Sequence, residues 1–352
     1  MKIGIDALKI SAGQASGIEN YLVNLLKGFE EIGMTGEIKK YGSPVVINEN
    51  FTRHFMLPHR MDQDRLDLAH FPDHILPLWP LKAKKVITVH DLAFKKYPQF
   101  YNMSKRWHKT WLTPGSIKKA DKIIAVSSAT KGDLIDLFGT PEEKIKVIHN
   151  GIASIFKLLN LSNMEKEQKK KKYGFKRLIL FVGTIEPRKN LKTLIEAFDS
   201  FVENEPDLGL IVCGKKGWLC DGILNEISDH KMIRYLDYVP TQELVELYNL
   251  AEIFVYPSFY EGFGFPPLEA MACGTPVITS NTSSLPEVTG DAALLVDPAD
   301  SRQIAEGITR LLNDKILRDD LIQKGLRRVK TFSWKKTAEE TWKLYQEVIK
   351  HG

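Results

Sequence analysis

The sequence predicts an α/β protein built from two doubly wound domains, each a parallel sheet with helices on both faces. The chain has 352 residues, more than the roughly 250–300 at which single hydrophobic cores stop growing, so two domains are expected. Short apolar runs alternate with stretches of helical period along almost the whole chain, which is typical of parallel sheets with crossover helices. The hydrophobic fraction of 43% is that of a globular protein, and no stretch approaches the roughly 18 apolar residues of a membrane-spanning helix.

The expected elements follow a similar order in both halves of the chain. Strands are expected over residues 2–7, 45–48, 66–71, 85–90, 122–127 and 144–149, and again over 177–183, 208–214, 232–236, 253–257, 276–279 and 293–296. Helices are expected over residues 17–31, 104–118, 129–138, 190–202, 241–251, 266–272 and 301–312. Each half therefore supplies one doubly wound sheet.

The domain boundaries follow from changes in composition. We place an N-terminal domain at residues 1–157, a lysine-rich linker at 158–174 and a C-terminal domain at 175–332. The linker contains four consecutive lysines and few apolar residues, which is typical of a solvated, partly helical segment; contact with a membrane surface or another polyanion is the alternative. A final helix is expected over 333–352, with Ser333 as its N-cap, and it can cross back to the first domain.

The net charge of +5 is unevenly distributed. Residues 1–150 hold 22 Lys and Arg against 16 Asp and Glu, or +6, and residues 151–352 hold 27 against 28, or −1. Six charges are too few to indicate a nucleic-acid partner, but they favour an anionic surface or substrate on the first half. Asp6 interrupts the apolar run that a signal peptide needs, and the three cysteines form no CxxC pair, so we expect a cytoplasmic protein without a disulfide framework.

The first candidate ligand segment connects the first strand to the first helix. Ligands of doubly wound sheets bind beyond the carboxyl ends of strands, where glycine-rich turns lead into helix N-termini. Residues 13–20 read Gly-Gln-Ala-Ser-Gly-Ile-Glu-Asn, and Gly17 allows close backbone approach to an anion. The segment matches neither GxGxxG nor a Walker A sequence, so an ordinary flexible loop is the alternative.

The second candidate segment follows the first strand of the second half. Gly183 and Thr184 end the strand, and the adjacent cations Arg188 and Lys189 stand just before a helix. Both cations and the helix dipole would act on the same anion, as a diphosphate leaving group requires. A solvated basic turn is the alternative.

The third candidate segment, residues 255–269, is the least ordinary one. Glu261 precedes a Gly-Phe-Gly turn, two prolines suit the first turn of the following helix, and Glu269 falls inside that helix. Carboxylates accept hydrogen bonds from vicinal hydroxyls, so two carboxylates eight residues apart can address two parts of one polyhydroxylated ligand. For Glu269, a surface position favoured by the helix dipole is the alternative.

The fourth candidate segment is the carboxyl end of the strand over residues 85–90, which delivers His90 and Asp91. A structural histidine is the alternative.

No metal site is expected. The DxD sequence of Asp62 and Asp64 lacks a preceding apolar strand, and the four histidines between residues 54 and 74 cluster only loosely and contain no HExxH sequence.

Taken together, the four segments resemble the retaining glycosyltransferases of the GT-B fold, the large group 1 or family-four class. The spacing of Glu261 and Glu269 matches the E-x7-E motif of that family, and residues 270–278 are similar to its continuation. Further similar segments are residues 126–128, 150–152, 284–288, 290–293 and 332–334. The resemblance extends from about residue 4 to the end of the chain. It implies two Rossmann-like domains facing across a cleft, the first for the acceptor and the second for a nucleotide sugar.

The resemblance also implies roles for individual residues of the second half. Glu269 would bind the ribose hydroxyls of the nucleotide, and Glu261 would contact the donor sugar near the reacting carbon. Arg188 and Lys189 would hold the diphosphate and stabilise charge on the leaving group. Backbone amides that would assist with the sugar and phosphate are those of Phe263, Gly264 and Phe265.

In the first half, Gly17 with its helix N-terminus would close over the diphosphate. His90 would lie near the donor sugar, with Asp91 beside it in support. One position departs from the family pattern: many members carry Arg directly after the glycine at Gly183, and this chain has Thr184. More of the phosphate interaction would then fall to the two cations of the second segment.

The implied reaction transfers a sugar from a nucleotide donor with retention at the anomeric carbon, through same-face attack assisted by the departing phosphate. Neither a metal nor a cofactor is expected. Residues 89–94 and 183–190 are most similar to the mannosyltransferase-like branch, which makes GDP-mannose the first expectation for the donor. The acceptor would be a saccharide, glycan or lipid-linked glycan in polysaccharide or glycoconjugate biosynthesis.

A peripheral contact with the inner face of an anionic membrane is a further hypothesis. Residues 97–122 interleave aromatic with basic side chains, as in segments that rest at a lipid interface. A core-facing aromatic stripe with a charged outer face is the alternative.

Two other functions remain open for this fold. One is a catalytically silent subunit that binds a sugar nucleotide, although the intact set Glu261, Glu269, Arg188, Lys189 and His90 opposes it. The other is a GT-B nucleotide-sugar epimerase. A dinucleotide-dependent oxidoreductase would need Rossmann glycines that the sequence lacks.

Overall fold

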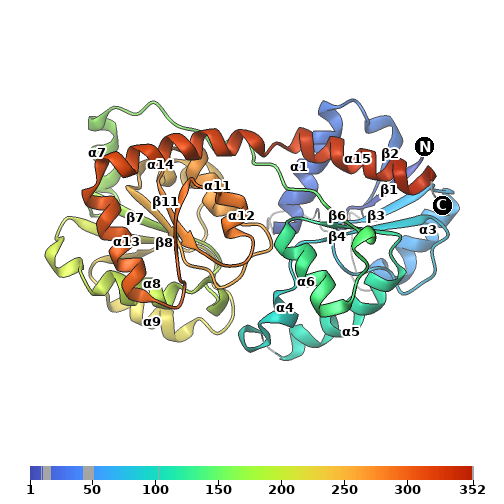
Figure 1. The fold of residues 1–352 in the computed structure, drawn as a ribbon, viewed down its shortest axis with the longest axis horizontal. Helices are drawn as coiled ribbons and strands as arrows, with labels where there is room; N and C mark the ends of the chain where they lie inside the picture. The colour runs from blue at the N-terminus through green and yellow to red at the C-terminus, as the bar shows by residue number, and fades with distance from the viewer. Residues whose placement is uncertain (9, 11–16, 43–50, 102, 351–352) are drawn as a thin grey trace. The chain divides into compact units, whose positions relative to one another are not determined.

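The computed structural model describes residues 1–8, 10, 17–42, 51–101 and 103–350, with the backbone alone for residues 103–108. The chain divides into two compact units (Figure 1). Unit 1 is Met1–Ala153 with Phe332–Gly352, and unit 2 is Ser154–Thr331. Within the described residues each unit holds one sheet of six strands, and every strand pair is parallel. The predicted pair of parallel α/β domains is confirmed.

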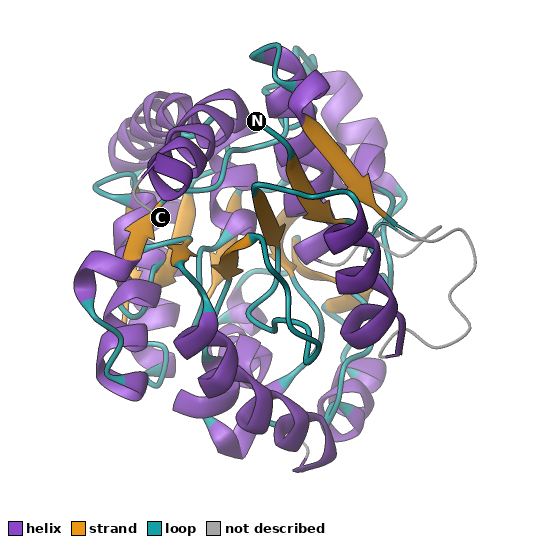
Figure 2. Cartoon of the chain, turned by 90° about the vertical axis from the view of Figure 1, so that its right-hand side faces the viewer, coloured by secondary structure: helices purple, strands orange, loops and turns teal. Residues whose placement is uncertain are grey.

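The sheet of unit 1 has the strand order β2-β1-β3-β4-β5-β6. Its strands are β1 (Ile3–Asp6), β2 (Ile38–Tyr41), β3 (Leu68–Phe71), β4 (Lys84–Val89), β5 (Lys122–Ala125) and β6 (Ile145–Val147). Its helices are α1 (Gly17–Glu31), α3 (Leu57–Gln63), α4 (Ala93–Lys96), α5 (Met103–Lys119), α6 (Ser128–Phe138) and α15 (Trp334–Lys350). Figure 2, which looks at this end of the molecule, shows the strands with helices on either side.

The sheet of unit 2 has the strand order β12-β11-β10-β7-β8-β9. Its strands are β7 (Arg177–Val182), β8 (Leu208–Cys213), β9 (Ile233–Tyr235), β10 (Ile253–Tyr256), β11 (Val277–Ser280) and β12 (Ala293–Val296). Its helices are α7 (Asn163–Lys171), α8 (Leu191–Asp199), α9 (Asp221–Asp229), α10 (Thr241–Leu250), α11 (Phe265–Ala272), α12 (Leu285–Thr289), α13 (Ser301–Asn313) and α14 (Lys315–Arg328).

Local sequence explains where these elements begin and which face they bury. The central strands are continuous apolar runs because helices cover both faces of the sheet, and all six residues of β8 are buried. Helix α8 buries Leu191, Leu194, Ile195 and Phe198, the spacing of an amphipathic helix. Ser127 caps α6 by accepting a hydrogen bond from a backbone amide in its first turn.

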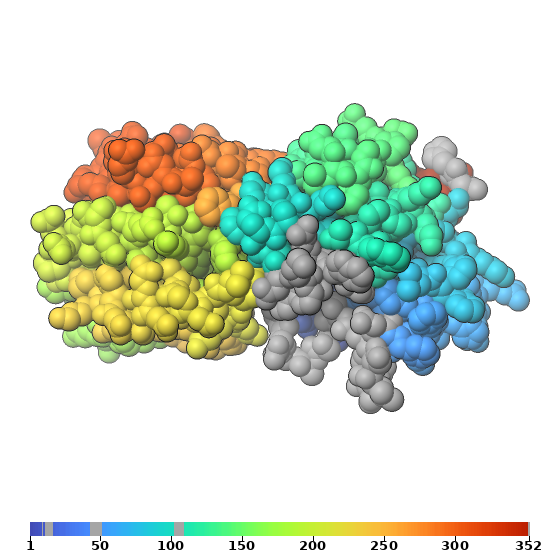
Figure 3. Space-filling model, turned by 90° about the horizontal axis from the view of Figure 1, so that it is seen from below, coloured from blue at the N-terminus to red at the C-terminus, as the bar shows by residue number. Residues whose placement is uncertain are grey.

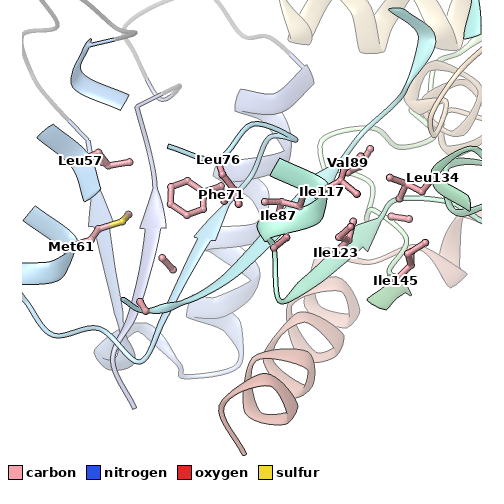
Figure 4. Close-up of a cluster of buried hydrophobic side chains, with 14 of the residues drawn as sticks. Leu57, Met61, Phe71, Leu76, Ile87, Val89, Ile117, Ile123, Leu134 and Ile145 are labelled. Atoms are coloured by element: carbon pink, nitrogen blue, oxygen red, sulfur yellow. The ribbon is translucent and has the colours of Figure 1, made fainter. Parts of the chain in front are cut away.

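One face of the unit 1 sheet packs into a continuous hydrophobic cluster (Figure 4). Phe71 from β3, Ile87 from β4 and Ile123 from β5 have no exposed surface. Helices contribute the other side chains of the cluster, among them Leu57 and Leu134. Burial of this apolar area is the main favourable contribution to the folding of unit 1.

Helix α15 is the last element of the chain and packs against α1 in unit 1 (Figure 1). Ser333 caps it, because the Oγ of Ser333 accepts a hydrogen bond from the amide of Lys336 at 3.2 Å. Near its other end, the hydroxyl of Tyr345 lies 2.6 Å from Nδ1 of the buried His70 in β3. A Cβ atom on Gly151 would lie 2.1 Å from the backbone nitrogen of Trp334, so the start of α15 fits here only beside glycine.

Several expected elements differ in the structure. Residues 45–48 lie outside the described residues, and β2 is found at Ile38–Tyr41, where two lysines interrupt the apolar pattern. Residues 158–174 are part of unit 2 rather than a separate linker. They contain α7. Lys169 in this helix pairs with Glu246 at 3.0 Å, and Lys172 just after it pairs with Glu243 at 2.8 Å. Such pairs between distant segments cannot be recognised from the lysine run alone.

Gly151→Ala should destabilise unit 1 by about 1–3 kcal/mol, because the new methyl group collides with backbone atoms that cannot rotate away. Gly132→Ala is the matched control: this glycine lies inside α6 with open space around its Cα, so alanine should be neutral or stabilising by about 0.5–1 kcal/mol. Denaturant unfolding measures both. Equal stability of Gly151→Ala and the parent chain would contradict the described packing.

Candidate functional site

The topology of unit 2 identifies where a ligand of this sheet binds. From the central strand β7 the chain runs outward through β8 and β9, and then returns to place β10 on the other side of β7. Ligands of doubly wound sheets bind beyond the carboxyl ends of the strands at this switch point. Gly183 directly follows β7, and Glu261 lies in the loop that follows β10. Two of the segments chosen from the sequence therefore meet at the same edge of the sheet.

The loop after β7 forms a short 3-10 helix, Pro187–Lys189, that leads into α8. Asn190 joins the two helices in the left-handed conformation, with φ of 58°, which asparagine tolerates better than most residues. Its side-chain amide donates hydrogen bonds to the carbonyls of Pro257, at 3.0 Å, and Pro298, at 2.6 Å. These hydrogen bonds hold the loop that carries Arg188 and Lys189 against the segment after β10.

Glu261 is 8% exposed and receives four polar contacts on one oxygen, Oε1. Nζ of Lys189 donates at 2.6 Å, the hydroxyl of Tyr256 at 2.9 Å and the hydroxyl of Ser258 at 2.7 Å. Nη1 of Arg188 lies 3.1 Å away. Among the described residues none donates to the second oxygen, Oε2, which leaves that oxygen able to accept from a ligand.

Arg188 is held on both sides by backbone and carboxylate groups. Its guanidinium donates to the carbonyl of Tyr260 at 2.6 Å and pairs with Glu186 at 2.5 Å. Its own carbonyl accepts a hydrogen bond from the amide of Phe259 at 3.0 Å and lies 3.1 Å from the hydroxyl oxygen of Ser258. The predicted contact partners Arg188, Lys189 and Glu261 are thus brought together in one buried cluster.

The charges of this cluster stabilise one another. Burial raises the pKa of Glu261, but Arg188, Lys189 and the hydrogen bonds to the carboxylate more than offset it and hold the pKa at about 2. Burial lowers the pKa of Lys189, an effect that Glu261 opposes. Burial likewise raises the pKa of Glu186, against the attraction of Arg188. Glu261 is therefore an ionised acceptor at neutral pH.

Glu269 lies in α11 and behaves differently from Glu261. Its Oε2 accepts a hydrogen bond from the hydroxyl of Tyr248 in α10 at 2.9 Å. Burial raises its pKa to about 7, and the bond from Tyr248 only partly opposes this shift. None of the described residues donates to Oε1 of Glu269. Both carboxylates of the E-x7-E motif thus have one oxygen bound to the protein and one available to a ligand.

The turn between the two carboxylates depends on Gly264. This glycine precedes α11 with φ of 105°, in the region that favours glycine, and a Cβ atom there would lie 2.8 Å from a methyl carbon of Leu285. The hydroxyl of Ser284 donates to the carbonyls of Glu261 and Phe263 and fixes the turn. Phe263 is buried, and Phe265 contacts it with ring centroids 5.3 Å apart. The backbone amides of the turn stand at the N-terminus of α11.

The remaining predicted residues of unit 2 are Gly183 and Thr184. The amide of Gly183 donates to the carbonyl of Cys213 at 2.8 Å, which continues the β7–β8 ladder by one residue. Thr184 is exposed at the start of the loop. Thr184 is too short to replace an arginine at this position, so Arg188 and Lys189 are the cations that the loop offers to an anion.

Gly17, His90 and Asp91 belong to unit 1. Gly17 is exposed and begins α1, and residues 13–16 of the same segment lie outside the described residues. Nε2 of His90 lies 3.0 Å from the carbonyl of Pro72, and the edge of the ring meets the ring of Tyr21. Burial lowers the pKa of His90, so the ring is neutral near pH 7 and Nε2 must carry the proton that the carbonyl accepts. The carboxylate of Asp91 accepts from the amide of Ala93 at 3.0 Å.

Several residues of the cluster were not predicted from the sequence. They are Tyr248, Tyr256, Ser258, Ser284 and Asn190, all of which hold the carboxylates or their loops through hydrogen bonds. Ser258 and Tyr256 stand within five residues of Glu261, and their hydroxyls in a buried segment were the available signal. The sequence gave no such indication for Tyr248, because a tyrosine at this position in α10 is typical of an ordinary core residue.

Two family models match this chain. One covers most of unit 2, and the other covers most of the N-terminal segment of unit 1. Residues 162–328 match "Glycosyl transferases group 1", and residues 35–154 match "Glycosyltransferase Family 4". An O-antigen chain mannosyltransferase B of Escherichia coli is 35% identical over 284 residues, which are 79% of this chain and 74% of that protein. The chain belongs to the group 1 glycosyltransferases. It is a glycosyltransferase of the GT-B fold, as the resemblance implied.

Other relatives of this glycosyltransferase have related names. The O-antigen chain mannosyltransferase RfbU of Salmonella typhimurium is 31% identical, over 66% of this chain and 62% of that protein. The serotype-specific mannosyltransferase WbdA of E. coli is 28% identical over 72% of this chain, which spans 32% of that longer protein.

Solved structures agree on the fold of the glycosyltransferase. A sucrose-phosphate synthase from Thermosynechococcus elongatus has a TM-score of 0.78 at 20% identity, with both chains covered in full. The Anabaena protein Alr3699/HepE, solved with UDP and glucose, has a TM-score of 0.74 at 17% identity, over 98% of this chain and 99% of that one.

Two features are absent from the described part of the glycosyltransferase. No group of three or more His, Cys, Asp or Glu residues in it is arranged to hold a metal ion. None of its helices combines the length and the apolar character needed to cross a bilayer.

Proposed function

We propose that this glycosyltransferase transfers mannose from GDP-mannose, with retention at the anomeric carbon, to a saccharide or lipid-linked glycan in polysaccharide biosynthesis. The observation behind the proposal is the pair of carboxylates, the buried Glu261 and the partly buried Glu269, each with one oxygen available to a ligand, and the cations of the loop after β7 that contact Glu261. Relatives named as O-antigen mannosyltransferases support mannose and an O-antigen type of product. Alr3699/HepE, solved with UDP-glucose, supports a nucleotide-sugar donor.

The donor would be bound through complementary hydrogen bonds. The available oxygen of Glu269 accepts from the ribose hydroxyls, and that of Glu261 accepts from hydroxyls of the sugar. The diphosphate lies near Arg188 and Lys189, and the amides at the start of α11 contribute further donors. The roles of Gly17 and His90 toward the donor stay predictions from the resemblance.

Chemistry at this site would depend on the leaving group. When the glycosidic bond to the nucleotide breaks, negative charge develops on the diphosphate, and fixed cations stabilise it more in the transition state than in the ground state. The departing phosphate would assist same-face attack by the acceptor hydroxyl. Neither metal nor cofactor takes part in this proposal.

The first test is calorimetry of the full chain with GDP-mannose, UDP-glucose, UDP-N-acetylglucosamine, UDP-galactose and the free diphosphates, without added metal. We expect GDP-mannose to bind, and Glu269→Ala to weaken binding by about 1–3 kcal/mol, because a buried hydrogen-bonding carboxylate is lost. Glu243→Ala, a change of a half-exposed glutamate on α10, is the matched control and should bind like the parent. Binding of a UDP sugar in place of GDP-mannose would refute the donor. No binding of any of these nucleotides would contradict the proposed nucleotide-sugar donor.

Lys189→Ala should reduce turnover by about 100-fold or more while changing GDP-mannose affinity much less, because charge on the leaving group is greatest in the transition state. Initial rates and calorimetry separate the two effects. Lys192→Ala is the matched control, since this lysine is 72% exposed on α8. Turnover of Lys189→Ala equal to that of the parent would contradict the proposed role. Circular dichroism has to show the parent's fold, because the change also removes a buried partner of Glu261.

Peripheral membrane contact through α5 is part of the proposal. Trp111 is 75% exposed, and the described part of the helix also carries Lys109, Lys118 and Lys119. Figure 3 shows the teal surface of this part of the chain on the side that faces the viewer. We expect the chain to bind vesicles containing phosphatidylserine at low salt, to dissociate as salt rises, and to bind more weakly after Trp111→Ala. Vesicles of phosphatidylcholine alone are the control. No binding to the anionic vesicles at low salt would end this part of the proposal.

A further inference from the structure

Unit 1 has a switch point of its own. The strand order β2-β1-β3-β4-β5-β6 means that the chain leaves β1 toward β2 and then returns to place β3 on the other side. The carboxyl ends of β1 and β3 are therefore the position where a ligand of this sheet binds. Asp6 is the last residue of β1, and Asp73 and His74 follow β3 by two and three residues.

Arg53 connects the two carboxylates at this point. Its Nε lies 3.6 Å from an oxygen of Asp6, and its Nη1 lies 3.5 Å from Oδ2 of Asp73. All three residues are buried, with 3–8% of their surface exposed. A buried arrangement of charges is costly unless its groups are paired, so the chain positions these side chains with some precision.

Asp73 also orients the ring of His74. Its Oδ1 accepts from the backbone amide of His74 at 2.7 Å and lies 2.9 Å from Nδ1 of the same residue. Burial raises the pKa of Asp73, but His74, Arg53 and Lys109 more than offset it, so the carboxylate is ionised and can only accept. Nδ1 must therefore carry a proton, and in the neutral imidazole Nε2 is a hydrogen-bond acceptor.

Nε2 of His74 has no partner. The residue is 5% exposed, its ring is stacked on Phe94 with centroids 5.6 Å apart, and Nε2 has no hydrogen-bond partner among the described residues. A buried acceptor without a donor normally costs free energy. Nε2 of His74 lies at a switch point, and Asp73 holds the imidazole in one tautomer. Nε2 is therefore suited to accept a hydrogen bond from a ligand.

The charges at this site select the class of ligand. Asp6 and Asp73 are two carboxylates, and the charges of Arg53 and Lys109 only balance them, so the site has no net positive charge that would attract a phosphate or carboxylate ligand. A neutral hydroxyl can donate to Nε2 without adding charge. The site also adjoins His90, whose charge state is influenced by both Asp73 and His74.

We propose that Asp73 and His74, held by Arg53, form the part of the acceptor site that binds a hydroxyl group of a neutral saccharide, with Nε2 of His74 accepting its hydrogen bond. This inference rests on the proposed function, because it assumes that unit 1 receives the acceptor. It adds that the acceptor presents an uncharged sugar residue at this position rather than a phosphorylated one. His74 is a positioning residue in this assignment, and no proton is transferred to it.

The test uses the full chain, GDP-mannose, and a panel of methyl glycosides of mannose, glucose, galactose and N-acetylglucosamine with their 6-phosphates as acceptors. His74→Phe keeps an aromatic ring against Phe94 and removes Nε2. We expect transfer to a neutral glycoside, and a loss of about 10- to 100-fold in kcat/KM for the acceptor in His74→Phe. The Kd for GDP-mannose and the rate of GDP release to water should stay within about twofold. His59→Phe, at an exposed histidine, is the matched control and should behave like the parent chain.

A second measurement uses the parent chain and therefore does not depend on whether a variant folds. In the parent chain labelled with ¹⁵N-histidine, the Nε2 resonance of His74 should have the shift of an unprotonated nitrogen and move when the accepted glycoside is added with GDP.

Three outcomes overturn the inference and leave the proposed function intact: unchanged acceptor kinetics in His74→Phe, an equal loss of GDP-mannose binding, or a preference for the 6-phosphates. Failure of the proposed function appears earlier, as a parent chain that does not bind GDP-mannose. In that case the inference falls as well.

Discussion

The buried carboxylate of Glu261 connects three segments of unit 2 that are far apart along the chain. Its Oε1 binds Lys189, which lies 72 residues earlier, and the hydroxyls of Tyr256 and Ser258, while its backbone amide donates to the hydroxyl of Ser283 at 3.0 Å. Charges so far from water are unfavourable unless every one is paired. The loop after β7 and the turn before α11 therefore have to form together, and removing either partner would leave an uncompensated charge in the other.

This arrangement also prepares the site for an anionic ligand. Arg188 and Lys189 are long, flexible side chains, and holding them in one conformation costs conformational entropy. The contacts to Glu261, Glu186 and the carbonyl of Tyr260 offset this loss of conformational entropy during folding. A diphosphate bound as proposed would meet cations that are already in place, which favours preorganised stabilisation of developing charge over rearrangement during the reaction.

The two units place similar groups at the switch points of two different sheets. In unit 2 an ionised carboxylate, Glu261, is held by Arg188 after strand β10. In unit 1 the ionised Asp73 is held by Arg53 after strand β3 and in turn orients His74. The surroundings differ in a way that separates their ligands. The unit 2 site adds a lysine and helix N-terminal amides, which suit a diphosphate, whereas the unit 1 site adds a second carboxylate, which suits a neutral hydroxyl.

The sequence by itself determined the fold class and most of the strands, because strands buried on both faces must be continuous apolar runs, as in Leu208–Cys213. The sequence did not predict the edge strand Ile38–Tyr41, because two exposed lysines interrupt the apolar run there. It also identified the residue types of the donor site, since Glu261 and Glu269 stand within one short segment. The contact between Lys189 and Glu261 and the orientation of the His74 ring by Asp73 are evident only in the three-dimensional structure. Those pairs depend on strand order and on the paths of the loops, which local periodicity does not encode.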